Sequence, residues 1–480
     1  MKPRAAIAAL VLALAVSARL NGAGDVAEAA TARKFAALRT QPLALEAFLR
    51  EMPKGGDLHN HLSGSIYAES YLRWAAEDQL CLLVATFTIV APPCDAAGRP
   101  AVSGVLQNSA LYNDTIDAMS MRGWPAGVSG HHHFFQAFAK FGLTSANHVG
   151  DMLAEVTARA AAEHVSYLEL MVTPDGGVAS RLGRETGWPA DGGTPAAMTQ
   201  LRTKLLASGW GDVLTQTRQR LDGFEARRRD VLKCGASGAD AGCLVTVRYI
   251  AQVGRAGPRE EVFAQVLAGF EIASNEPRVV ALNLVQPEDD PTALRDFSLQ
   301  MSMIAFLRPF YPNVHITLHA GELSDGLVPP EALRFHIRES VRTGHASRIG
   351  HGAAAMQEDD PFGLMRELAA KKVLVEIALS SNDMILGVRG ARHPLRTYLQ
   401  YGVPVALVTD DYGVARSTHT LEWLKAVQEQ GLDYLTVKRM VRNSVDYSFA
   451  DAPTKARLKQ SLENAFRQFE QQETAAAPLR

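Results

Sequence analysis

The sequence has little cysteine and no strong excess of charge, and both features narrow the classes of protein to which it can belong. Only four of its 480 residues are cysteine. No two of them have the C-x-x-C spacing of a zinc site with paired cysteine ligands. Its 49 lysines and arginines against 51 aspartates and glutamates leave a formal charge of -2. The chain therefore has no basic field for a polyanion, and we do not expect nucleic acid as a partner.

Long apolar segments are also lacking, since no run after the N-terminus is long enough to cross a bilayer. The N-terminus places Lys2 and Arg4 before an apolar run at residues 5–16, which the small residues Val-Ser-Ala follow. This arrangement predicts a secretory signal peptide at residues 1–18, with no cysteine after it to carry a lipid. We expect a secreted or periplasmic protein without a membrane anchor.

Export makes the four cysteines informative, because an oxidising compartment allows them to pair. They form two close pairs in stretches rich in Gly, Ala, Pro and Asp, namely Cys81 with Cys94 and Cys234 with Cys243. Two local disulfides are the simplest interpretation. Four unpaired thiols are the alternative, and four cysteines allow three connectivities.

Short runs rich in β-branched residues recur eight times, and helical patterns separate most of them. The runs lie at residues 56–62, 165–173, 244–253, 278–285, 313–320, 347–352, 372–379 and 403–409. Alternating strands and helices indicate βαβ units with a parallel sheet. Eight repeats favour an α/β fold closed into a (β/α)8 barrel, with a doubly wound open sheet as the alternative. We assign residues 53–480 to this one domain, after a helical extension at 19–52.

Two connections exceed a minimal crossover, residues 70–145 after the first strand and 175–240 after the second. We interpret them as insertions on the face where barrel active sites form. The first contains "GHHHFFQAF" at 130–138, and three consecutive histidines on a helix fan out instead of converging. The expected positions are the surface or pocket rim for His131, His132 and His133, and the core or pocket wall for Phe134, Phe135 and Phe138.

The carboxyl ends of the predicted strands carry most of the side chains suited to chemistry. In the first run His59 and His61 lie two residues apart, so on a strand both imidazoles point to the same side. The fifth run ends in "LHAGE", the sixth is "RIGHG" and the eighth ends in "VTDD". Because strand ends meet at one face of a barrel, the following side chains should converge there: His59, His61, His319, Glu322, His351, Asp410 and Asp411.

Each residue type suits one role at such a site. Three histidines and one carboxylate can hold a divalent ion and leave room for a water, and zinc is the default for nitrogen-rich ligation. The ion lowers the pKa of that water from roughly 16 to about 7. Glu322 and His351 remain free for proton transfer. One Zn²⁺ per chain is expected, with the ligands His59, His61, His319 and Asp410.

The motifs "MPKGGDLHNHLSGS", "YLELMVTP", "TLHAGE", "RIGHG", "SSN" and "VTDD" occur in this order over most of the chain. The pattern resembles the adenosine deaminase family of metal-dependent hydrolases. The export signal, the long early insertion and "KGGDLHNH" are most similar to its secreted, growth-factor-like branch. The resemblance implies hydrolytic deamination of adenosine and 2'-deoxyadenosine, and in that branch an N-terminal extension such as 19–52 is compatible with a homodimer.

The resemblance also implies a role for each proton-transfer residue. Glu322 is expected to protonate the purine nitrogen N1, His351 to orient and deprotonate the attacking water, and Asp411 to accept a hydrogen bond at N7. Addition at C6 requires a protonated N1, so the donor must be a carboxyl group that stays neutral near pH 7. A buried glutamate with apolar walls can be that donor.

Three positions depart from the family pattern. Ser63 stands where an acidic residue usually helps to hold the ribose, and Gln286 stands where a glycine backbone usually lets the purine approach. Met171 stands where arginine is frequent. We expect Ser63 and Gln286 to contact the substrate and to alter its pocket. They favour two alternatives: a deaminase of a modified adenosine or free aminopurine, and a nucleoside-binding protein with little turnover.

Overall fold

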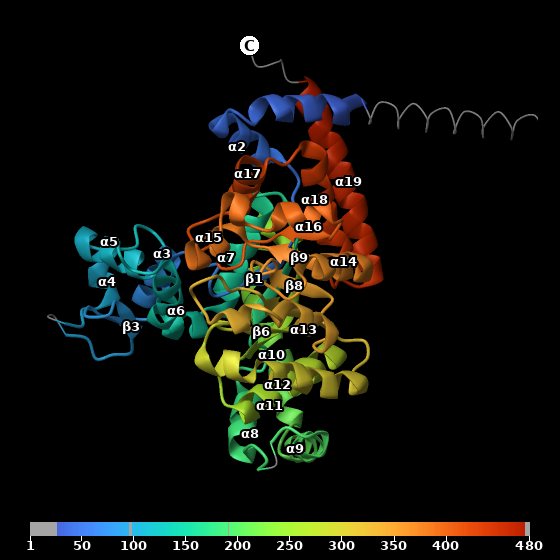
Figure 1. Ribbon diagram of the computed structural model, residues 1–480. Helices are drawn as coiled ribbons and strands as arrows, with labels where there is room; N and C mark the ends of the chain where they lie inside the picture. The colour runs from blue at the N-terminus through green and yellow to red at the C-terminus, as the bar shows by residue number, and fades with distance from the viewer. Residues whose placement is uncertain (1–25, 96–97, 191, 476–480) are drawn as a thin grey trace, which may run out of the picture.

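Eight parallel strands form the centre of the molecule in a computed structural model that describes residues 26–95, 98–190 and 192–475 (Figure 1). Their order in the sheet follows their order in the chain, from β1 to β10. The strands are β1 Gly55–His61, β4 Val165–Val172, β5 Thr246–Gly254, β6 Val279–Val285, β7 His315–Ala320, β8 Arg348–His351, β9 Leu374–Ile377 and β10 Val405–Leu407. All eight strands expected from the sequence are present.

Backbone contacts between the first and last strands close the sheet. Asp410, just after β10, forms a parallel bridge with Asn60 of β1. Its N–H donates to the carbonyl of His59 at 2.9 Å, and its carbonyl accepts from the N–H of His61 at 3.1 Å. The predicted (β/α)8 barrel is confirmed, and the open doubly wound sheet is excluded.

The outer helices cover the barrel on all sides, which explains why the strands are apolar almost throughout. β9 reads LVEI and β10 reads VAL, and every residue in both is buried. Two of the covering helices begin with an aspartate cap and a proline, both of which favour a helix start. The covering helices are α7 Val149–Ala162, α11 Arg259–Asn275, α12 Pro291–Leu307, α13 His336–Arg342, α14 Pro361–Lys371, α15 Leu379–Leu386 and α16 Leu395–Gln400.

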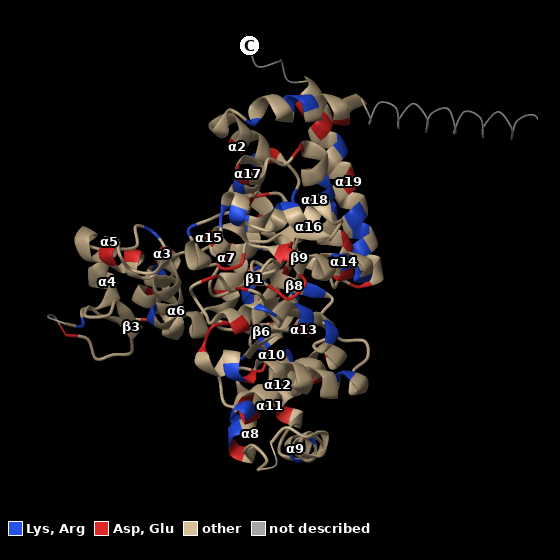
Figure 2. Cartoon of the chain, viewed as in Figure 1, with Lys and Arg blue, Asp and Glu red and all other residues tan. Residues whose placement is uncertain are grey.

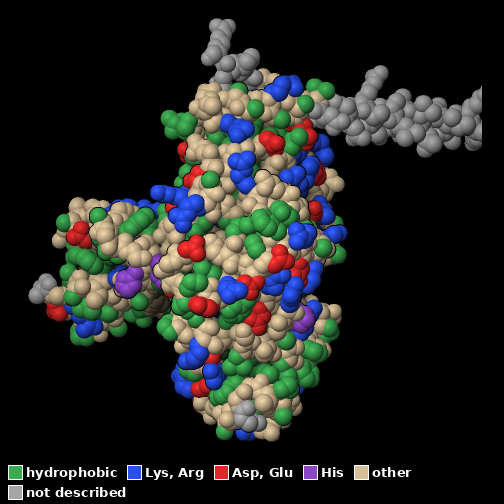
Figure 3. All heavy atoms as spheres, in the orientation of Figure 1, with side chains coloured by type: hydrophobic (Ala, Val, Ile, Leu, Met, Phe, Trp, Pro, Cys, Tyr) green, Lys and Arg blue, Asp and Glu red, His purple; other side chains and the backbone are tan. Residues whose placement is uncertain are grey.

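The first long connection builds a lobe beside the barrel (Figures 1 and 3). Its elements are α3 Ala68–Glu77, the antiparallel pair β2 Cys81–Leu83 and β3 Thr88–Val90, α4 Val102–Val105, α5 Ser109–Ala118 and α6 Gly130–Asn147. A disulfide joins Cys81 to Cys94. Helix α6 lies between the lobe and the barrel, and it packs against α15 closely enough that a Cβ on Gly130 would lie 2.0 Å from the carbonyl oxygen of Met384.

The second long connection is helical. It contains α8 Val178–Thr186, α9 Pro195–Ala207, α10 Gly211–Val231 and a short 3-10 helix at Ala241–Leu244. The second disulfide joins Cys234 to Cys243, so both local disulfides expected from the sequence are present. Helix α8 packs on α11, where a Cβ on Gly183 would lie 2.5 Å from the carbonyl oxygen of Glu260.

Two helices near the N-terminus, residues 26–38 and α2 (Pro42–Glu51), pack on the C-terminal helices at one end of the molecule (Figure 1). The C-terminal helices are α17 His419–Gln430, α18 Tyr434–Asp446 and α19 Ala452–Ala475. The ring of Phe48 lies 6.3 Å from that of Tyr434 and 5.0 Å from that of Phe469. The expected signal peptide at 1–18 lies outside the described residues.

Charged side chains of both signs are interspersed over the outer helices in Figure 2, in keeping with the formal charge of -2. Among the described residues, no helix combines the length and apolarity needed to cross a membrane.

Candidate active site

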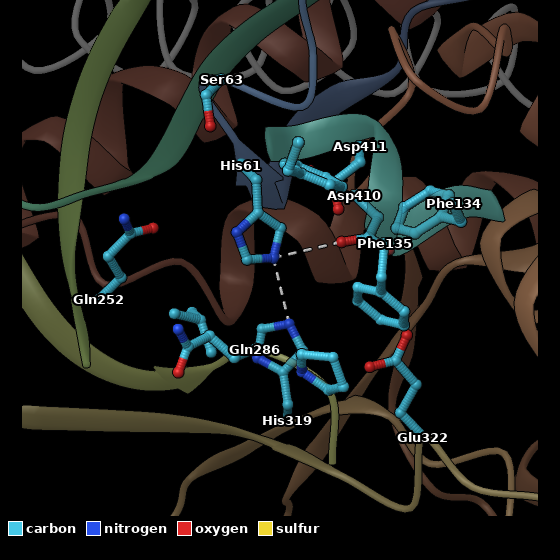
Figure 4. Close-up of a pocket in the computed structure, with 13 residues that line it drawn as sticks. His61, Ser63, Phe134, Phe135, Gln252, Gln286, His319, Glu322, Asp410 and Asp411 are labelled. Atoms are coloured by element: carbon cyan, nitrogen blue, oxygen red, sulfur yellow. Dashed lines mark hydrogen bonds and ion pairs between the residues drawn. The ribbon is translucent and has the colours of Figure 1, made fainter. Parts of the chain in front are cut away.

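Four candidate metal ligands from three separate parts of the barrel meet at one point, and Figure 4 shows three of them, His61, His319 and Asp410. The Nε2 atoms of His59 and His61 lie 3.0 and 3.1 Å from Nε2 of His319. Asp410 Oδ1 lies 3.4 and 3.3 Å from the same atoms of His59 and His61. All four ligand atoms fall within 4.8 Å of one another. The convergence expected for these four residues is therefore what the structure shows.

The donor set fits a divalent ion for a second reason. Asp410 Oδ1 is buried and has no hydrogen-bond partner in the described part of the chain. A buried carboxylate oxygen without a partner is unfavourable unless a cation or a donor satisfies it. Three imidazole nitrogens beside it complete a donor set that zinc commonly takes in proteins.

Three of the four ligands are held by a partner that orients the atom facing the site. His59 Nδ1 lies 2.7 Å from Glu376 Oε2, and His319 Nδ1 lies 3.0 Å from Asn283 Oδ1. Asp410 Oδ2 accepts a hydrogen bond from Ser381 Oγ at 2.6 Å. A histidine that donates through Nδ1 leaves the lone pair of Nε2 for a metal.

Behind this layer, Glu376 belongs to a buried charged network. Arg348 lies 2.6 Å from Glu376 and 2.6 Å from Glu169, and Thr317 donates to Glu376 at 2.9 Å. These donors keep Glu376 ionised, and its pKa is lowered although burial alone would raise it. Glu376 is therefore an anionic acceptor for the His59 imidazole.

Backbone geometry at the strand ends also serves the site. His351 and Asp410 have φ angles of 67° and 56°, in the left-handed region that residues with a side chain seldom adopt. Gly64 lies so close to Asp411 that an added Cβ would be 1.5 Å from Oδ1 of that carboxyl. Glycine is required at this position by the close approach of the aspartate.

The two proton-transfer candidates lie beside the ligand group. His351 Nε2 is 3.7 Å from Glu322 Oε1, and these two residues with Asp410 form a second group within 4.8 Å. His351 Nδ1 lies 3.0 Å from Asn382 Oδ1, while its Nε2 is buried without a hydrogen-bond partner in the described structure. The backbone N–H of Glu322 donates to Glu288 Oε2 at 2.7 Å. The imidazole of His351 is thus held by Asn382, and the side chain of Glu322 lines the cavity.

Burial controls the protonation of the carboxyl groups here. It raises the pKa of Glu322 to about 7, with a further upward contribution from nearby Asp410 and an opposing one from His351. Burial, followed by the charge of Asp410, also holds the pKa of Asp411 well above its usual range. Glu322 is therefore poised to be a proton donor near neutral pH.

A cavity of about 350 Å³ opens over these residues. Phe134, Phe135 and Phe138 of α6 line it, as expected for a pocket wall. Of the three histidines before them, His131 is half-buried, and its Nε2 lies 2.9 Å from Asp289 Oδ1. The cavity is thus walled by aromatic rings on the side that the first insertion covers.

The three departures from the family pattern have different surroundings. Ser63 and Gln286 both line the cavity, as expected. Gln286 has a φ of 79°, and its side-chain oxygen accepts from the N–H of Ala256 at 2.9 Å. The residue thus keeps a backbone conformation that favours glycine. Met171 instead contacts Asn283, whose Nδ2 lies 3.4 Å from the Met171 sulfur.

Sequence reasoning missed several residues that support the site. Ser381 and Asn382, in the motif "SSN", were given no chemical role, although both are buried in α15 and hold Asp410 and His351. Glu376 and Asn283 were not singled out. Their signal was present, since a charged or amide residue within a buried apolar strand requires a specific partner.

A closed (β/α)8 barrel brings three imidazoles and an aspartate together at its strand ends, a donor set suited to a metal-dependent hydrolase. The family model described as Adenosine deaminase matches residues 217–465, which is more than half of the 480 residues. The chain belongs to the adenosine deaminase family. His59 and His61 precede the matched region, and the fold brings them to His319 and Asp410 inside it.

Curated relatives match over parts of their length. An aminodeoxyfutalosine deaminase from Streptomyces coelicolor is 31% identical over 206 residues, which cover 41% of this chain and 49% of the relative. An adenosine deaminase from Escherichia coli is 32% identical over 149 residues, which cover 31% of this chain and 41% of the relative. The chain thus spans about half or less of the length of these relatives.

Solved structures match over nearly the whole chain and show the same fold. An amidohydrolase from Burkholderia ambifaria, with bound Zn, has a TM-score of 0.59 at 19% identity and covers 90% of this chain and 95% of its own. The N6-mAMP deaminase of arabidopsis has a TM-score of 0.56 at 19% identity and covers 87% and 99%.

Proposed function

We propose that this protein is a zinc-dependent deaminase that converts adenosine and 2'-deoxyadenosine to inosine and 2'-deoxyinosine, with release of ammonia. The observation that carries the proposal is the meeting of three imidazoles and one aspartate within 4.8 Å, beside a glutamate whose pKa is about 7. Membership of the adenosine deaminase family supports hydrolysis of a C–N bond.

His59, His61, His319 and Asp410 would hold one zinc ion, because their free ring nitrogens and carboxylate oxygen are its usual donors. When bound, such an ion acidifies a water molecule so that it can attack carbon at neutral pH. His351 Nε2, which has no partner in the described structure, accepts the proton of the attacking water. Asn382 keeps the other ring nitrogen of His351 engaged, so the imidazole stays in the orientation that this transfer requires.

Glu322 and His351 each transfer a proton twice in the proposed reaction, once in each direction. A bond forms between the water oxygen and C6 as Glu322 gives its proton to N1, so the ring accepts the electron pair. The C6–N6 bond then breaks: His351 returns its proton to the leaving amine, and Glu322 takes the proton of the C6 hydroxyl. Inosine and ammonia result, and both residues regain their starting protonation states.

Asp411 would hold the purine at N7. Sequence reasoning assigned it as the acceptor of this hydrogen bond, yet N7 of an adenine is itself a lone-pair acceptor. We therefore propose that the protonated Asp411 carboxyl donates to N7. Gly64 supports this role by allowing the carboxyl to lie against the backbone that leads from β1.

The substrate could instead be a modified adenosine or a free aminopurine. This alternative is favoured by Gln286, whose side chain occupies the cavity wall from a backbone position suited to glycine. The names of relatives, which include an adenine deaminase from Sinorhizobium fredii and the N6-mAMP deaminase of arabidopsis, show that amine-bearing purines differ among similar proteins. A second alternative is a nucleoside-binding protein that retains the metal ligands and turns over little.

A nucleoside panel tests these proposals. Zinc-loaded protein is incubated with adenosine, 2'-deoxyadenosine, adenine and N6-methyladenosine, and the released amine and the ultraviolet spectrum of the product are measured. Turnover of adenosine with equimolar ammonia supports the main proposal. Turnover of adenine or N6-methyladenosine alone would replace it with the first alternative, and adenosine binding without turnover would replace it with the second.

We also propose that the protein is exported to the periplasm or the medium. The two disulfides support this proposal, because such bonds persist in oxidising compartments. Membership of the secreted branch and homodimer formation stay predictions. Mass spectrometry of the natural protein tests export, since a mature chain that begins after residue 18 is expected.

A further inference from the structure

A second cavity of about 340 Å³ lies next to the active-site cavity, and Ser63 and Gln252 line both. In Figure 4, Gln252 and Glu322 lie on opposite sides of the His61–His319 pair. The second cavity therefore begins at the end of the active site away from the proton donor. It lies between β4, α7 and the second insertion, whose helix α10 contributes Arg220 and Phe224.

The two cavities differ in the ionisable side chains that line them. The active-site cavity contains three carboxyl groups, those of Glu322, Asp410 and Asp411. Among the described residues that line the second cavity, Arg220 is the one with a charged side chain. The remaining wall is largely apolar, with Met152 as an example. The guanidinium would attract a negatively charged group to the second cavity.

Arg220 forms no ion pair with a carboxylate of the described residues. None of their carboxylates lies within 4.0 Å of its guanidinium, and its Nε is buried without a hydrogen-bond partner among them. The guanidinium carbon lies 5.3 Å from the ring centroid of Phe224. It also packs on the loop after β4, where a Cβ on Gly176 would be 3.0 Å away. The side chain is held in place while its capacity to pair with an anion stays unused.

We propose that the second cavity binds an anionic group attached to the 5' carbon of the nucleoside, with Arg220 as its counter-ion. This inference rests on the proposed function. If Glu322 protonates N1, the sugar at N9 points away from Glu322, because N1 and N9 lie at opposite ends of a purine. The sugar then lies near Ser63 and Gln252, and a group beyond its 5' carbon enters the second cavity.

The anionic group should present two neighbouring oxygens, which a guanidinium binds through two parallel hydrogen bonds. A phosphate and a carboxylate both meet this requirement. Adenosine 5'-monophosphate and adenosine 5'-carboxylic acid are therefore the two test substrates, and their relative rates distinguish the two sources. Adenosine is the neutral reference.

The kinetic test compares kcat/KM for these three substrates in the wild type and in Arg220→Gln, Arg220→Lys and Arg229→Gln. Arg229 lies on the exposed side of the same helix and controls for loss of charge. An anionic substrate should exceed adenosine by about tenfold or more, and Arg220→Gln should remove that advantage. Arg220→Lys should retain part of it, and Arg229→Gln should behave as the wild type. An advantage that is absent, or that survives in Arg220→Gln, would overturn the proposal.

A binding measurement separates this proposal from the proposed function. Calorimetry of the zinc-loaded protein with inosine 5'-monophosphate and inosine should give a Kd about tenfold lower for the anion, and Arg220→Gln should equalise the two. If this holds but no purine is deaminated, the anion site stands and the proposed function fails. If adenosine is deaminated but the two products bind equally in the wild type, the anion site fails and the proposed function stands.

Discussion

Replacement of Glu322 by glutamine should slow deamination by about a thousandfold while the zinc ligands stay in place. Glutamine has nearly the same shape and can still hydrogen-bond to the substrate, but it has no acidic proton to give to N1. Loss of a general acid typically lowers kcat by about a hundredfold to ten-thousandfold, and a loss of about a thousandfold corresponds to about 4 kcal/mol of the barrier. The absence of Glu322 from the group of four ligand atoms predicts unchanged zinc content.

The kcat/KM of the wild type should fall as the pH rises above 7. Burial raises the pKa of Glu322 to about 7, so the protonated acid is present below that pH and is lost above it. For the wild type, kcat/KM should therefore fall about tenfold for each pH unit above 7. The residual activity of Glu322→Gln should lack this decline.

The assay is the release of ammonia from adenosine between pH 5 and 9, with zinc measured in the same samples. Glu331→Gln is the matched control, since Glu331 is exposed in the connection that follows Glu322. Wild-type rates in Glu322→Gln with full zinc would refute its assignment as the acid. A wild-type profile without any decline above neutral pH would refute the effect of burial.

Three further predictions concern residues that shape the site. Gly64→Ala should reduce kcat/KM by about a hundredfold with zinc retained, because the added Cβ would displace Asp411. Gly104→Ala should leave kcat/KM unchanged in the same steady-state assay, because a Cβ there meets no neighbour. Glu376→Gln should weaken zinc binding by about tenfold to a hundredfold in a chelator competition, since the anionic acceptor of His59 is lost. An unchanged zinc affinity would show that Glu376 does not act on the metal site. Gln286→Val should lower the free energy of unfolding in urea by about 1–2 kcal/mol, because a β-branched residue tolerates a φ of 79° poorly. The free energy of unfolding of Gln286→Gly should stay within about 1 kcal/mol of the wild-type value.

The strand-end motifs could be predicted from the sequence because each follows a run that is apolar on both faces. Such runs mark parallel strands, and parallel strands of one barrel bring their ends to one face. This is why His59, His319 and Asp410 were found although 351 positions separate the first from the last.

The supporting residues could not be found in this way. Ser381 and Asn382 have side chains that favour turns, and tertiary bonds, among them those to Asp410 and His351, engage these side chains within α15. The position of Arg220 beside the second cavity depends on the packing of α10 against the loop after β4, a contact that no local pattern encodes. Local patterns thus predicted the ligands, while the surrounding layer depends on tertiary packing.

The central claim is that four distant residues bind one zinc ion beside Glu322. Anomalous diffraction at the zinc edge from crystals of the purified protein tests it directly. We predict one strong peak per chain, about 2.0–2.2 Å from Nε2 of His59, His61 and His319 and from Oδ1 of Asp410. A protein that deaminates adenosine with no peak there, or with its zinc bound at other residues, would contradict the account.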